Sequence, residues 1–335
     1  MNDAPPPSTT DFDVLGIGNA LVDVLSTEDD DFIAAYDLVK GSMTLIDTDR
    51  AEELYAAMGS KTEMSGGSAA NTLSGIASFG GRAAYTGRVR DDGLGKAFAH
   101  ALNSLGVHFS SPKAPDGDPT GRCMIVVTPD GERTMNTYLG ASATLGVDDL
   151  DQDLIGRSSV TFLEGYLFDR DEAKEAFRKA AAAAHSAGRK VALTLSDGFC
   201  VDRHREDFLA LVDDGIDILF ANEDEITKLY GTESFDDGVA EVRGRCEIAA
   251  VTRGAAGSVI VVGDETIEVA AQPVARLVDT TGAGDLYAAG FLFGLTAGRP
   301  LPDCGRLGSL AASAVIGHMG PRPGLSLAQV IEAAP

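Results

Sequence analysis

The residues with the clearest chemical potential form one polar turn, Asp279-Thr280-Thr281-Gly282-Ala283-Gly284-Asp285, which runs into an apolar helix of small residues predicted to begin near Leu286. Gly282, Ala283 and Gly284 carry little or no side chain, so backbone N–H groups ahead of the helix can approach an anion. These N–H groups lack partners within the helix and lie at its positive end, an arrangement that suits a phosphate.

Asp285 closes this turn with a carboxylate, which would repel a phosphate unless the acid has a chemical task. In phosphoryl transfer an Asp can accept the proton of the attacking hydroxyl while backbone donors stabilise the moving phosphoryl group. An Asp after glycines can also do no more than cap a helix. Because the whole turn is present, the sequence favours a base over a cap.

The turn resembles the C-terminal signature of the PfkB (ribokinase-like) carbohydrate and nucleoside kinases, and other segments along most of the chain agree with that family. The resemblance implies that Asp285 is the catalytic base and that the backbone from Gly282 to Asp285, with Ala283 and Gly284, forms an anion hole. It also implies ATP as co-substrate and Mg²⁺ as its metal ion. Many relatives are activated by K⁺, and the start of this turn could help to form a K⁺ site.

Asn19 and Asp23 are polar residues in the otherwise apolar stretch Phe12 to Leu25, which begins as a buried strand. They suit a polyhydroxylated ligand, although a turn or edge strand with solvated Asn and Asp explains them equally well. A dinucleotide fold is disfavoured because Leu21 stands where the third glycine is needed. The stretch resembles the opening of adenosine kinases, in which the Asp matching Asp23 holds the ribose hydroxyls.

Gly66, Gly67 and Asn71 precede a predicted helix of small residues. The glycine pair allows close backbone approach to a ligand, and the Asn offers a donor and an acceptor; tight packing alone explains the small residues equally well. The spacing resembles the N-terminal signature of the family, in which these residues contact the sugar. With the Asn19 segment, it places the chain closest to the adenosine kinase branch.

Asn222 and Glu225 follow a predicted strand, at the edge of the sheet where ligands bind. The pair is a helix capping signature. It also resembles the family's N-x-x-E motif, in which Asn222 and Glu225 would organise metal and phosphates, Glu225 acting on Mg²⁺ through water.

Thr252, Arg253, Gly254 and Gly257 resemble the nucleotide segment of the family. The glycines would let the backbone approach ATP, and Arg253 is a candidate cation for its phosphates. A helix predicted over 308–317 corresponds to the region that walls the adenine in relatives.

Strands and helices alternate from Val160 onward, which predicts a mostly parallel sheet with helices on both faces. Gly121 to Tyr138 predicts a hairpin around Pro129-Asp130-Gly131. Arg133 either reaches an anion or lies at the surface of the hairpin, and the surface position is favoured. In relatives such hairpins form a lid. We therefore expect a disordered tail over 1–11 and a ribokinase-like three-layer α/β/α domain over 12–335, with a small β-sheet lid formed by parts of 15–50 and 110–140.

Composition narrows the class of protein further. The 335 residues are 44% hydrophobic, enough for a sizeable core. The balance of 27 basic and 51 acidic residues argues against nucleic acid and membrane partners. Four widely spaced cysteines indicate neither a zinc site nor a disulfide framework. Because no signal peptide or membrane span is recognisable, we expect a cytoplasmic location.

The sequence therefore predicts an ATP-dependent kinase acting on the 5′-hydroxymethyl group of a nucleoside, adenosine first, as a monomer or homodimer. Ribose or another free sugar is the alternative acceptor. Tyr166 could stack on a purine, whereas no basic cluster beside Asn19 or Gly66 suggests a phosphorylated sugar. A non-catalytic nucleoside-binding protein would not need Asp285, and no G-x-x-x-x-G-K-[ST] supports a P-loop kinase.

Overall fold

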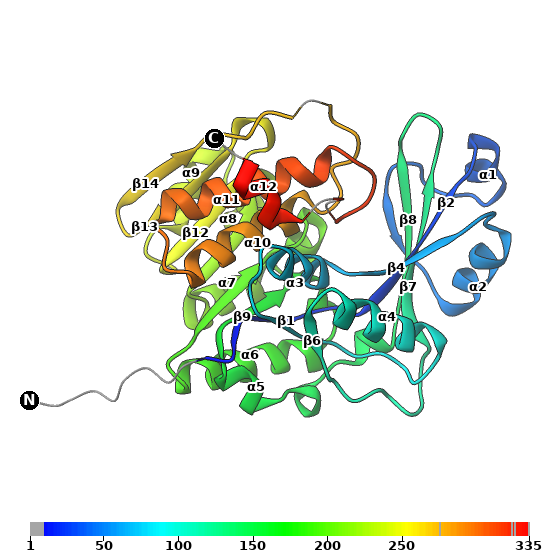
Figure 1. Ribbon diagram of the computed structural model, residues 1–335, viewed down its shortest axis with the longest axis horizontal. Coiled ribbons are helices and arrows are strands. Elements are labelled where there is room, and N and C mark those ends of the chain that lie inside the picture. Colours follow the sequence, from blue (N-terminus) through cyan, green and yellow to red (C-terminus); the bar gives the residue numbers. More distant parts are fainter. Residues whose placement is uncertain (1–9, 275, 323, 325, 334–335) are drawn as a thin grey trace, which may run out of the picture.

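The computed structural model describes residues 10–274, 276–322, 324 and 326–333, which form two sheets of unequal size (Figure 1). The larger sheet has the order β14-β13-β12-β11-β10-β9-β1-β5-β6 and is parallel except for β13, which pairs antiparallel with β12 and β14. Its strands are β1 Phe12–Ile17, β5 Ala83–Thr86, β6 Val107–Phe109, β9 Ser158–Glu164, β10 Lys190–Thr194, β11 Ile218–Asn222, β12 Ile248–Thr252, β13 Ser258–Val262 and β14 Glu265–Val269.

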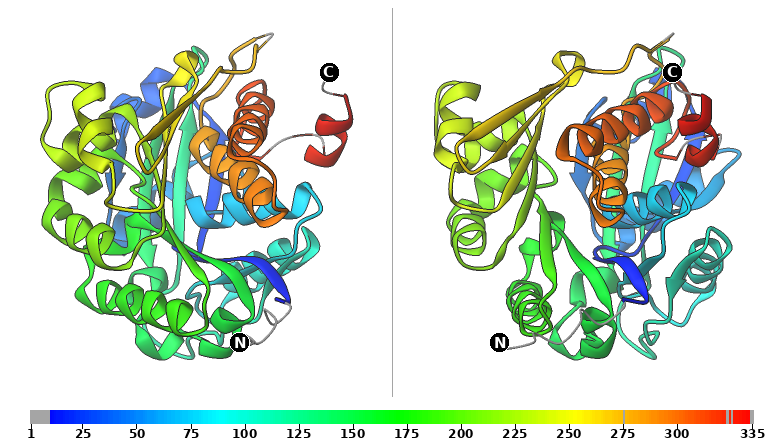
Figure 2. Two further views of the ribbon diagram at one scale, coloured as in Figure 1. Left: turned by 90° about the vertical axis from the view of Figure 1, so that its left-hand side faces the viewer. Right: turned by 60° about the vertical axis from the view of Figure 1, so that its left-hand side comes forward.

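Helices cover both faces of this sheet. Successive side chains of a strand point to opposite faces, and apolar residues on both faces are buried under helices. Val14 of β1 packs into one buried cluster, whereas its neighbours Leu15 and Ile17 pack into another. The first face carries α3 Ser68–Ser78, α4 Gly93–Ser104, α10 Ala283–Thr296, α11 Leu301–Ile316 and α12 Leu327–Ala333; the second carries α5 Gln152–Gly156, α6 Asp171–Ser186, α7 Gly198–Gly215, α8 Glu223–Tyr230 and α9 Phe235–Val242. The predicted three-layer α/β/α fold is confirmed (Figure 2).

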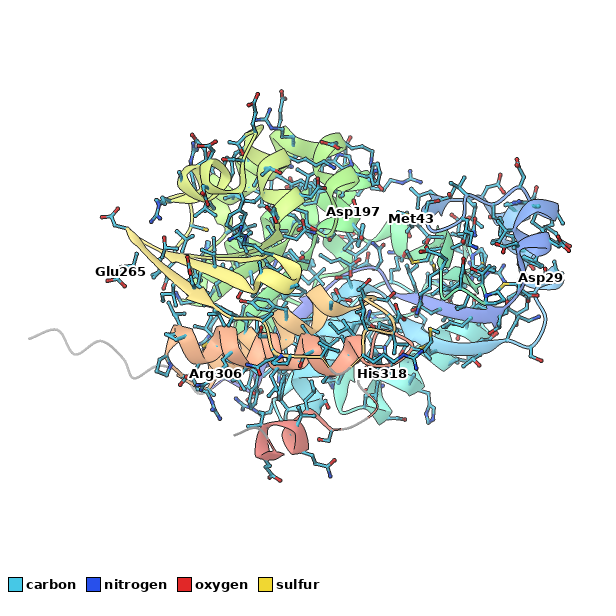
Figure 3. The ribbon with its side chains drawn as sticks, turned by 90° about the horizontal axis from the view of Figure 1, so that it is seen from above. Asp29, Met43, Asp197, Glu265, Arg306 and His318 are labelled. Carbon is cyan, nitrogen blue, oxygen red and sulfur yellow. The ribbon has the colours of Figure 1, made fainter. Side chains whose placement is uncertain are left out.

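The smaller sheet has the order β3-β8-β7-β2-β4 and carries α1 Asp30–Ala35 and α2 Thr48–Ala57. Its strands are β2 Leu21–Thr27, β3 Met43–Leu45, β4 Thr62–Gly66, β7 Thr120–Val127 and β8 Arg133–Gly140. β4 lies outside the ranges predicted for a lid, so the small sheet takes up more of the chain than expected. Seen from above, Asp29 of this unit and Glu265 of the large sheet lie at opposite ends of the molecule (Figure 3).

Three local predictions differ from the structure. The stretch 12–25 forms two strands in different sheets, because the chain crosses over at 18–20. α10 begins at Ala283 instead of near Leu286, so Asp285 lies in its first turn. Residues 1–9 of the predicted disordered tail lie outside the described residues, but Asp11 is ordered by a backbone N–H bond of 2.9 Å to the Arg157 carbonyl.

Among the helices of the described residues, none combines the length and the apolar character that crossing a bilayer requires.

Candidate active site

Asp285 is held by two donors from another helix. Its Oδ1 accepts a hydrogen bond of 2.6 Å from Ser68 Oγ, and its Oδ2 accepts one of 3.0 Å from Asn71 Nδ2. Burial raises the pKa of Asp285, although the bonds from Ser68 and Asn71 oppose that rise. The carboxylate does not cap α10, because Gly282 is the N-cap residue and no side chain bonds there. Asp285 is therefore an oriented carboxylate with increased basicity, which are the properties that a proton acceptor requires.

Gly75 brings the two helices that carry these groups together. A side chain on Gly75 of α3 would place its Cβ 2.6 Å from Ala289 Cβ and 2.8 Å from Leu286 Cδ1 of α10, which is closer than real contacts allow. The glycine therefore lets α3 and α10 pack closely side by side (Figure 1). Hydrogen bonds from Ser68 and Asn71 bring the first turn of α3 to Asp285 in the first turn of α10.

The turn before α10 leaves backbone donors free. Gly282 has a φ of +77°, and a side chain there would lie 2.8 Å from the Pro321 carbonyl oxygen, so only glycine fits easily. The Ala283 N–H donates to the Thr280 carbonyl at 3.1 Å. Among the described residues, no partner is recorded for the N–H groups of Gly284 and Asp285. Free N–H groups at a helix start can stabilise an anion.

Arg133 is buried and bound to this turn, so its predicted position at the surface is wrong. Its Nη1 donates to Asp279 Oδ2, which also accepts the Gly320 N–H at 2.8 Å, while Asp279 Oδ1 accepts the Thr281 N–H at 2.9 Å. Burial pushes the pKa of Asp279 upward, but the Thr281 and Gly320 bonds and the Arg133 charge outweigh burial and lower it. The arginine of the small sheet thus fixes the acid that shapes the turn.

Asp23 is a buried carboxylate that faces the glycine pair. Only 8% of the residue is exposed, so the alternative of a solvated Asp is wrong. A side chain on Gly66 would collide with its carboxylate. Burial raises the pKa of Asp23 to about 6, Arg322 and Arg133 lower it, and Asp285 raises it. No hydrogen-bond partner for this carboxylate is recorded among the described residues, so it can accept from a ligand.

Arg322 also reaches the acceptor side. Its Nη2 donates to the Ser65 carbonyl next to Gly66, and burial lowers its pKa while the charge of Asp23 opposes that effect. Two arginines therefore act on Asp23, and the expectation of no basic cluster beside Gly66 is wrong.

Asn19 and Asn71 enter the site differently from the prediction that they contact the sugar directly. Asn19 Nδ2 donates to Glu164 Oε1 at 3.0 Å, and Asn71 Nδ2 donates to Asp285. In both residues Oδ1 is buried without a partner among the described residues. Each amide therefore holds a carboxylate with its nitrogen, and its buried oxygen has no partner among the described residues.

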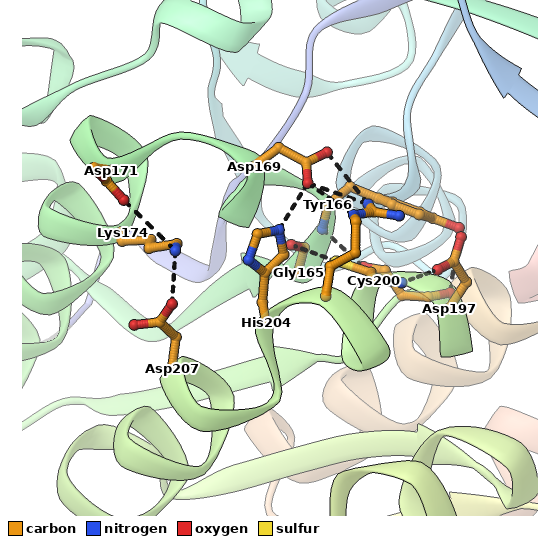
Figure 4. Close-up of polar contacts among 11 residues, drawn as sticks. Gly165, Tyr166, Asp169, Asp171, Lys174, Asp197, Cys200, His204 and Asp207 are labelled. Carbon is orange, nitrogen blue, oxygen red and sulfur yellow. Dashed lines mark hydrogen bonds and ion pairs between the residues drawn. The ribbon is translucent and has the colours of Figure 1, made fainter.

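Tyr166 lies against the loop that follows β10, beside Asp197 (Figure 4). Its N–H donates to Ser196 Oγ at 3.2 Å, and its hydroxyl donates to the Ser196 carbonyl at 3.3 Å. Burial, with the charges of Asp197 and Asp285, raises the pKa of Tyr166 well above its usual value. The ring is thus a neutral, half-buried surface near the base, and its stacking on a purine stays a prediction.

A pocket of about 600 Å³ opens on the other side of the turn. Thr252, Gly254 and Gly257 line it with Ala283 and Gly284 of the turn, and α11 forms a further wall, as predicted for the region around 308–317. Gly257 has a φ of +89°, and a side chain there would collide with the Val269 carbonyl. Small residues therefore leave room for a nucleotide beside the free N–H groups.

Arg253 takes a different position from a phosphate-binding cation. Its guanidinium carbon lies 4.2 Å from the centre of the Phe235 ring, and Arg253 is not among the residues that line the pocket. Its Nε is buried without a partner among the described residues. In this structure the arginine packs on α9, so its predicted contact with ATP requires a different side-chain position.

Asn222 and Glu225 form the capping box that was one of the two interpretations. Asn222 Oδ1 accepts the Glu225 N–H at 2.9 Å, and both carboxylate oxygens of Glu225 accept from Asn222. Burial raises the pKa of Glu225 to about 7, the Asn222 N–H opposes it, and Asp197, Asp224 and Asp285 add to it. In the described ranges, no group of three or more His, Cys, Asp or Glu residues could hold a metal. The acidic surroundings fit Mg²⁺ only through its water ligands.

The structure adds Ser68, Glu164 and Arg322 to the predicted residues. Glu164 ends an apolar strand, and a lone acid at the carboxyl end of a buried strand is a signal that sequence inspection can use. Ser68 lies three residues before Asn71, one helical turn away, so it shares the same helix face. Arg322 lies in a loop rich in Pro and Gly and gives no comparable signal.

Comparisons with known proteins agree with this geometry. The family described as pfkB family carbohydrate kinase matches residues 30–327. An adenosine kinase structure from Sinorhizobium meliloti is 53% identical, with a TM-score of 0.90 over 96% of this chain and 98% of that one. A probable sugar kinase structure from Rhizobium etli CFN 42 is 49% identical, with a TM-score of 0.91 over 97% and 98%. A ribokinase from Arabidopsis thaliana is 28% identical over 72% of this chain and 64% of that protein.

Proposed function

The chain belongs to the pfkB family of carbohydrate kinases, and from this premise we propose that it transfers the terminal phosphoryl group of ATP to the 5′-hydroxyl of a nucleoside, adenosine first. One observation carries the proposal. Asp285 lies between the acceptor side, where Asp23 has a free buried carboxylate, and the pocket lined by Gly284. A base at this junction can reach an alcohol on one side and a phosphate on the other.

In the proposed reaction, Asp285 accepts the proton of the 5′-hydroxyl while that oxygen forms its bond to the terminal phosphorus of ATP. The bond from phosphorus to the bridging oxygen breaks, and ADP leaves with the electron pair. The N–H groups of Gly284 and Asp285 stabilise charge on the moving phosphoryl group. Mg²⁺, when bound, neutralises charge on the ATP phosphates, and Asn222 and Glu225 would orient its water ligands.

The charges beside the acceptor favour a neutral molecule. Arg133 and Arg322 are the two cations that act on Asp23, and they lie among the carboxylates of Asp23, Asp279 and Asp285. The cluster therefore keeps a net negative charge, which repels a second phosphate on the acceptor. The free carboxylate of Asp23 can accept hydrogen bonds from two neighbouring ribose hydroxyls.

The small sheet supplies an apolar surface on the same face as Asp23. Cys123, Ile125 and Val127 of β7 form a buried cluster with Leu25 and Met135. Asp23 pairs with Cys123 and Leu25 pairs with Ile125 in register, so these side chains share a face. Leu25 and Met135 are only partly buried, and a nucleobase would cover more of their apolar area than a free sugar would, which favours a nucleoside. The adenosine kinase from Sinorhizobium meliloti supports adenosine as the first acceptor to test.

A free sugar such as ribose is the second candidate, since the Rhizobium etli relative at 49% identity is described as a probable sugar kinase. Its hydroxyls could use Asp23 and the free amide oxygens of Asn19 and Asn71 without the apolar surface.

Measurement of ADP release with adenosine, inosine, ribose and fructose 6-phosphate tests the proposal. We expect the highest kcat/KM with adenosine, followed by inosine, and least with fructose 6-phosphate. A higher kcat/KM with ribose than with both nucleosides would assign the chain to sugar phosphorylation instead. ADP release that no acceptor raises above the background rate would remove both candidates.

Potassium activation, a monomeric or homodimeric state and a cytoplasmic location stay proposals. Asp279 already accepts from Arg133, Thr281 and Gly320, so the turn offers K⁺ no free carboxylate in this arrangement. Turnover in KCl and in choline chloride at equal ionic strength tests the ion requirement.

A further inference from the structure

We propose that Glu164 is a positioning residue for the base, because its carboxylate fixes the first turn of α3, which carries both donors to Asp285. The inference rests on the proposed role of Asp285 as the proton acceptor. It concerns how that acid is aimed, and it assigns Glu164 no contact with ATP or the acceptor.

Glu164 joins three segments at the carboxyl edge of the large sheet. It ends β9, its Oε1 accepts the backbone N–H and Nδ2 of Asn19 at 3.2 and 3.0 Å, and its Oε2 accepts the Ala69 N–H at 2.8 Å. Asn19 lies at the crossover between the two sheets, and Ala69 lies in the first turn of α3. The carboxylate therefore ties the helix start to the crossover and to the sheet.

Ala69 lies next to Ser68 and two residues before Asn71, the donors to Asp285. A shift of the first turn of α3 would move both donors together. Because Glu164 holds the backbone of that turn, it fixes where Ser68 Oγ and Asn71 Nδ2 meet the carboxylate. The connection from Glu164 to the base therefore passes through one turn of helix.

Close packing leaves the carboxylate little alternative space. A side chain on Gly18 would collide with Glu164 Oε2 and with Ala69 Cβ. Gly67 has a φ of +95°, and a side chain there would collide with the Asn19 carbonyl oxygen. The two glycines thus allow the crossover and the helix start to close around Glu164.

The contacts of Glu164 distinguish it from a substrate ligand. The residue is 1% exposed, and both of its oxygens already accept from protein N–H groups. Those N–H donors satisfy an ionised carboxylate, whereas protonation would place an O–H donor against an N–H donor and break the hydrogen bond. The holding contact therefore depends on the charged form.

Titratable groups from three elements interact with Glu164: Asp285 of α10, Tyr85 of β5 and Cys200 of α7. Burial raises the pKa of Glu164 to about 7, the Ala69 and Asn19 bonds oppose it, and Asp285 adds to it. Protonation near neutral pH should therefore loosen the turn that aims the base, and kcat should decline as pH falls through about 7.

Glu164→Gln tests the inference, because the amide keeps the shape and removes the charge. We expect kcat with the best acceptor to fall about 10- to 100-fold, as for a base that is misaligned but present. KM for that acceptor should change less than about threefold, because the contacts with substrate remain. The decline of kcat near pH 7 should become shallower than in the wild type, because Glu164 no longer titrates while Glu225, whose pKa is also raised to about 7, still does. The midpoint of thermal unfolding at pH 8 should not fall, because the variant removes a buried charge.

Thr161→Val is the matched control. Thr161 lies in the same strand, is fully buried and has a hydroxyl without a partner among the described residues. Its substitution should leave kcat and the pH profile unchanged.

Three results would overturn the inference: unchanged kcat in Glu164→Gln, a decline of kcat near pH 7 as steep as in the wild type, or a fall in kcat matched by a lower unfolding temperature. A wild type without kinase activity on any acceptor would instead defeat the proposed function.

Discussion

On the proposed acceptor side of Asp285, buried carboxylates are held by polar side chains, whereas on the proposed ATP side small residues and free backbone groups line a pocket. Asp285, Glu164 and Asn71 depend on specific partners at fixed distances. The ATP pocket is lined by residues such as Gly254 and Ala283, whose side chains contribute little beyond leaving space. The acceptor side should therefore respond to changes of charge, and the ATP side to changes of volume.

The largest effect expected on the acceptor side comes from Asp285→Asn. The amide fits the same space but cannot accept the proton, so kcat should fall by about 10² to 10⁴. Acceptor KM should change little, because Ser68 and Asn71 remain available to hold the side chain. Steady-state kinetics with the best acceptor gives both constants, and a kcat within threefold of the wild type would show that Asp285 is not the base.

On the ATP side, Gly282→Ala adds only one methyl group. That methyl group would press on Pro321, and φ of +77° is unfavourable for Ala, so the turn should shift away from the phosphoryl group. Loss of one such donor lowers kcat by about 10² to 10³.

Gly298→Ala is the control for Gly282→Ala. Gly298 follows the other end of α10 with a φ of +69° and has open space where the methyl group would lie. Gly298→Ala therefore introduces a similar strain from a positive φ, but its methyl group makes no contact with Pro321. If both variants lost activity equally, strain alone would explain the effect, and the turn would not act through its shape.

Asp23→Asn should weaken binding of the acceptor and leave binding of ATP unchanged. Hydrogen bonds to a charged group contribute about 1.5 to 3 kcal/mol, so KM for adenosine should rise about 10- to 150-fold. KM for ATP should stay within about twofold, because Asp23 lies across the base from the pocket. Equal rises in both constants would show that the two sides are not separate.

The smallest effect concerns stability. Asp23 has a pKa raised to about 6, and Glu164 and Glu225 have pKa values raised to about 7. These groups bind protons more tightly in the folded chain, so their contribution to stability is present below about pH 4 and is lost as pH rises through 6 to 7. Calorimetry of the ligand-free protein should show a midpoint several degrees lower at pH 8 than at pH 6.

Asp23→Asn should flatten only the part of this slope near pH 6, because the amide does not titrate, whereas Glu164 and Glu225 carry the part near pH 7. Asp279 does not contribute in this range, because its hydrogen bonds from Thr281 and Gly320 and the charge of Arg133 lower its pKa from an ordinary value that already lies below the range. An unfolding midpoint that rises from pH 6 to pH 8 would show that the pKa values of these buried carboxylates are not raised in the folded protein.

The same contrast explains how much could be predicted from sequence. The fold followed from alternating strands and helices, and the glycines of both sides stand in short patterns along the chain. Asp23 and Asp285 could be identified as site residues because they also belong to short patterns along the chain. Partners distant in sequence could not: Glu164 meets Asn19 across 145 positions, and Arg133 meets Asp279 across 146. Spacing along the chain does not indicate such pairs. The sequence therefore assigns Asn19 and Asn71 to a ligand, although in the structure each holds a carboxylate.

The ion pair between Arg133 and Asp279 has a mechanical consequence. Arg133 is the first residue of β8 in the small sheet, and Asp279 lies in the turn before α10, so one ion pair joins the small sheet to the turn that carries the proposed anion site. An outward movement of the small sheet would have to separate these buried charges, and the turn before α10 would then lose one of the contacts that hold it.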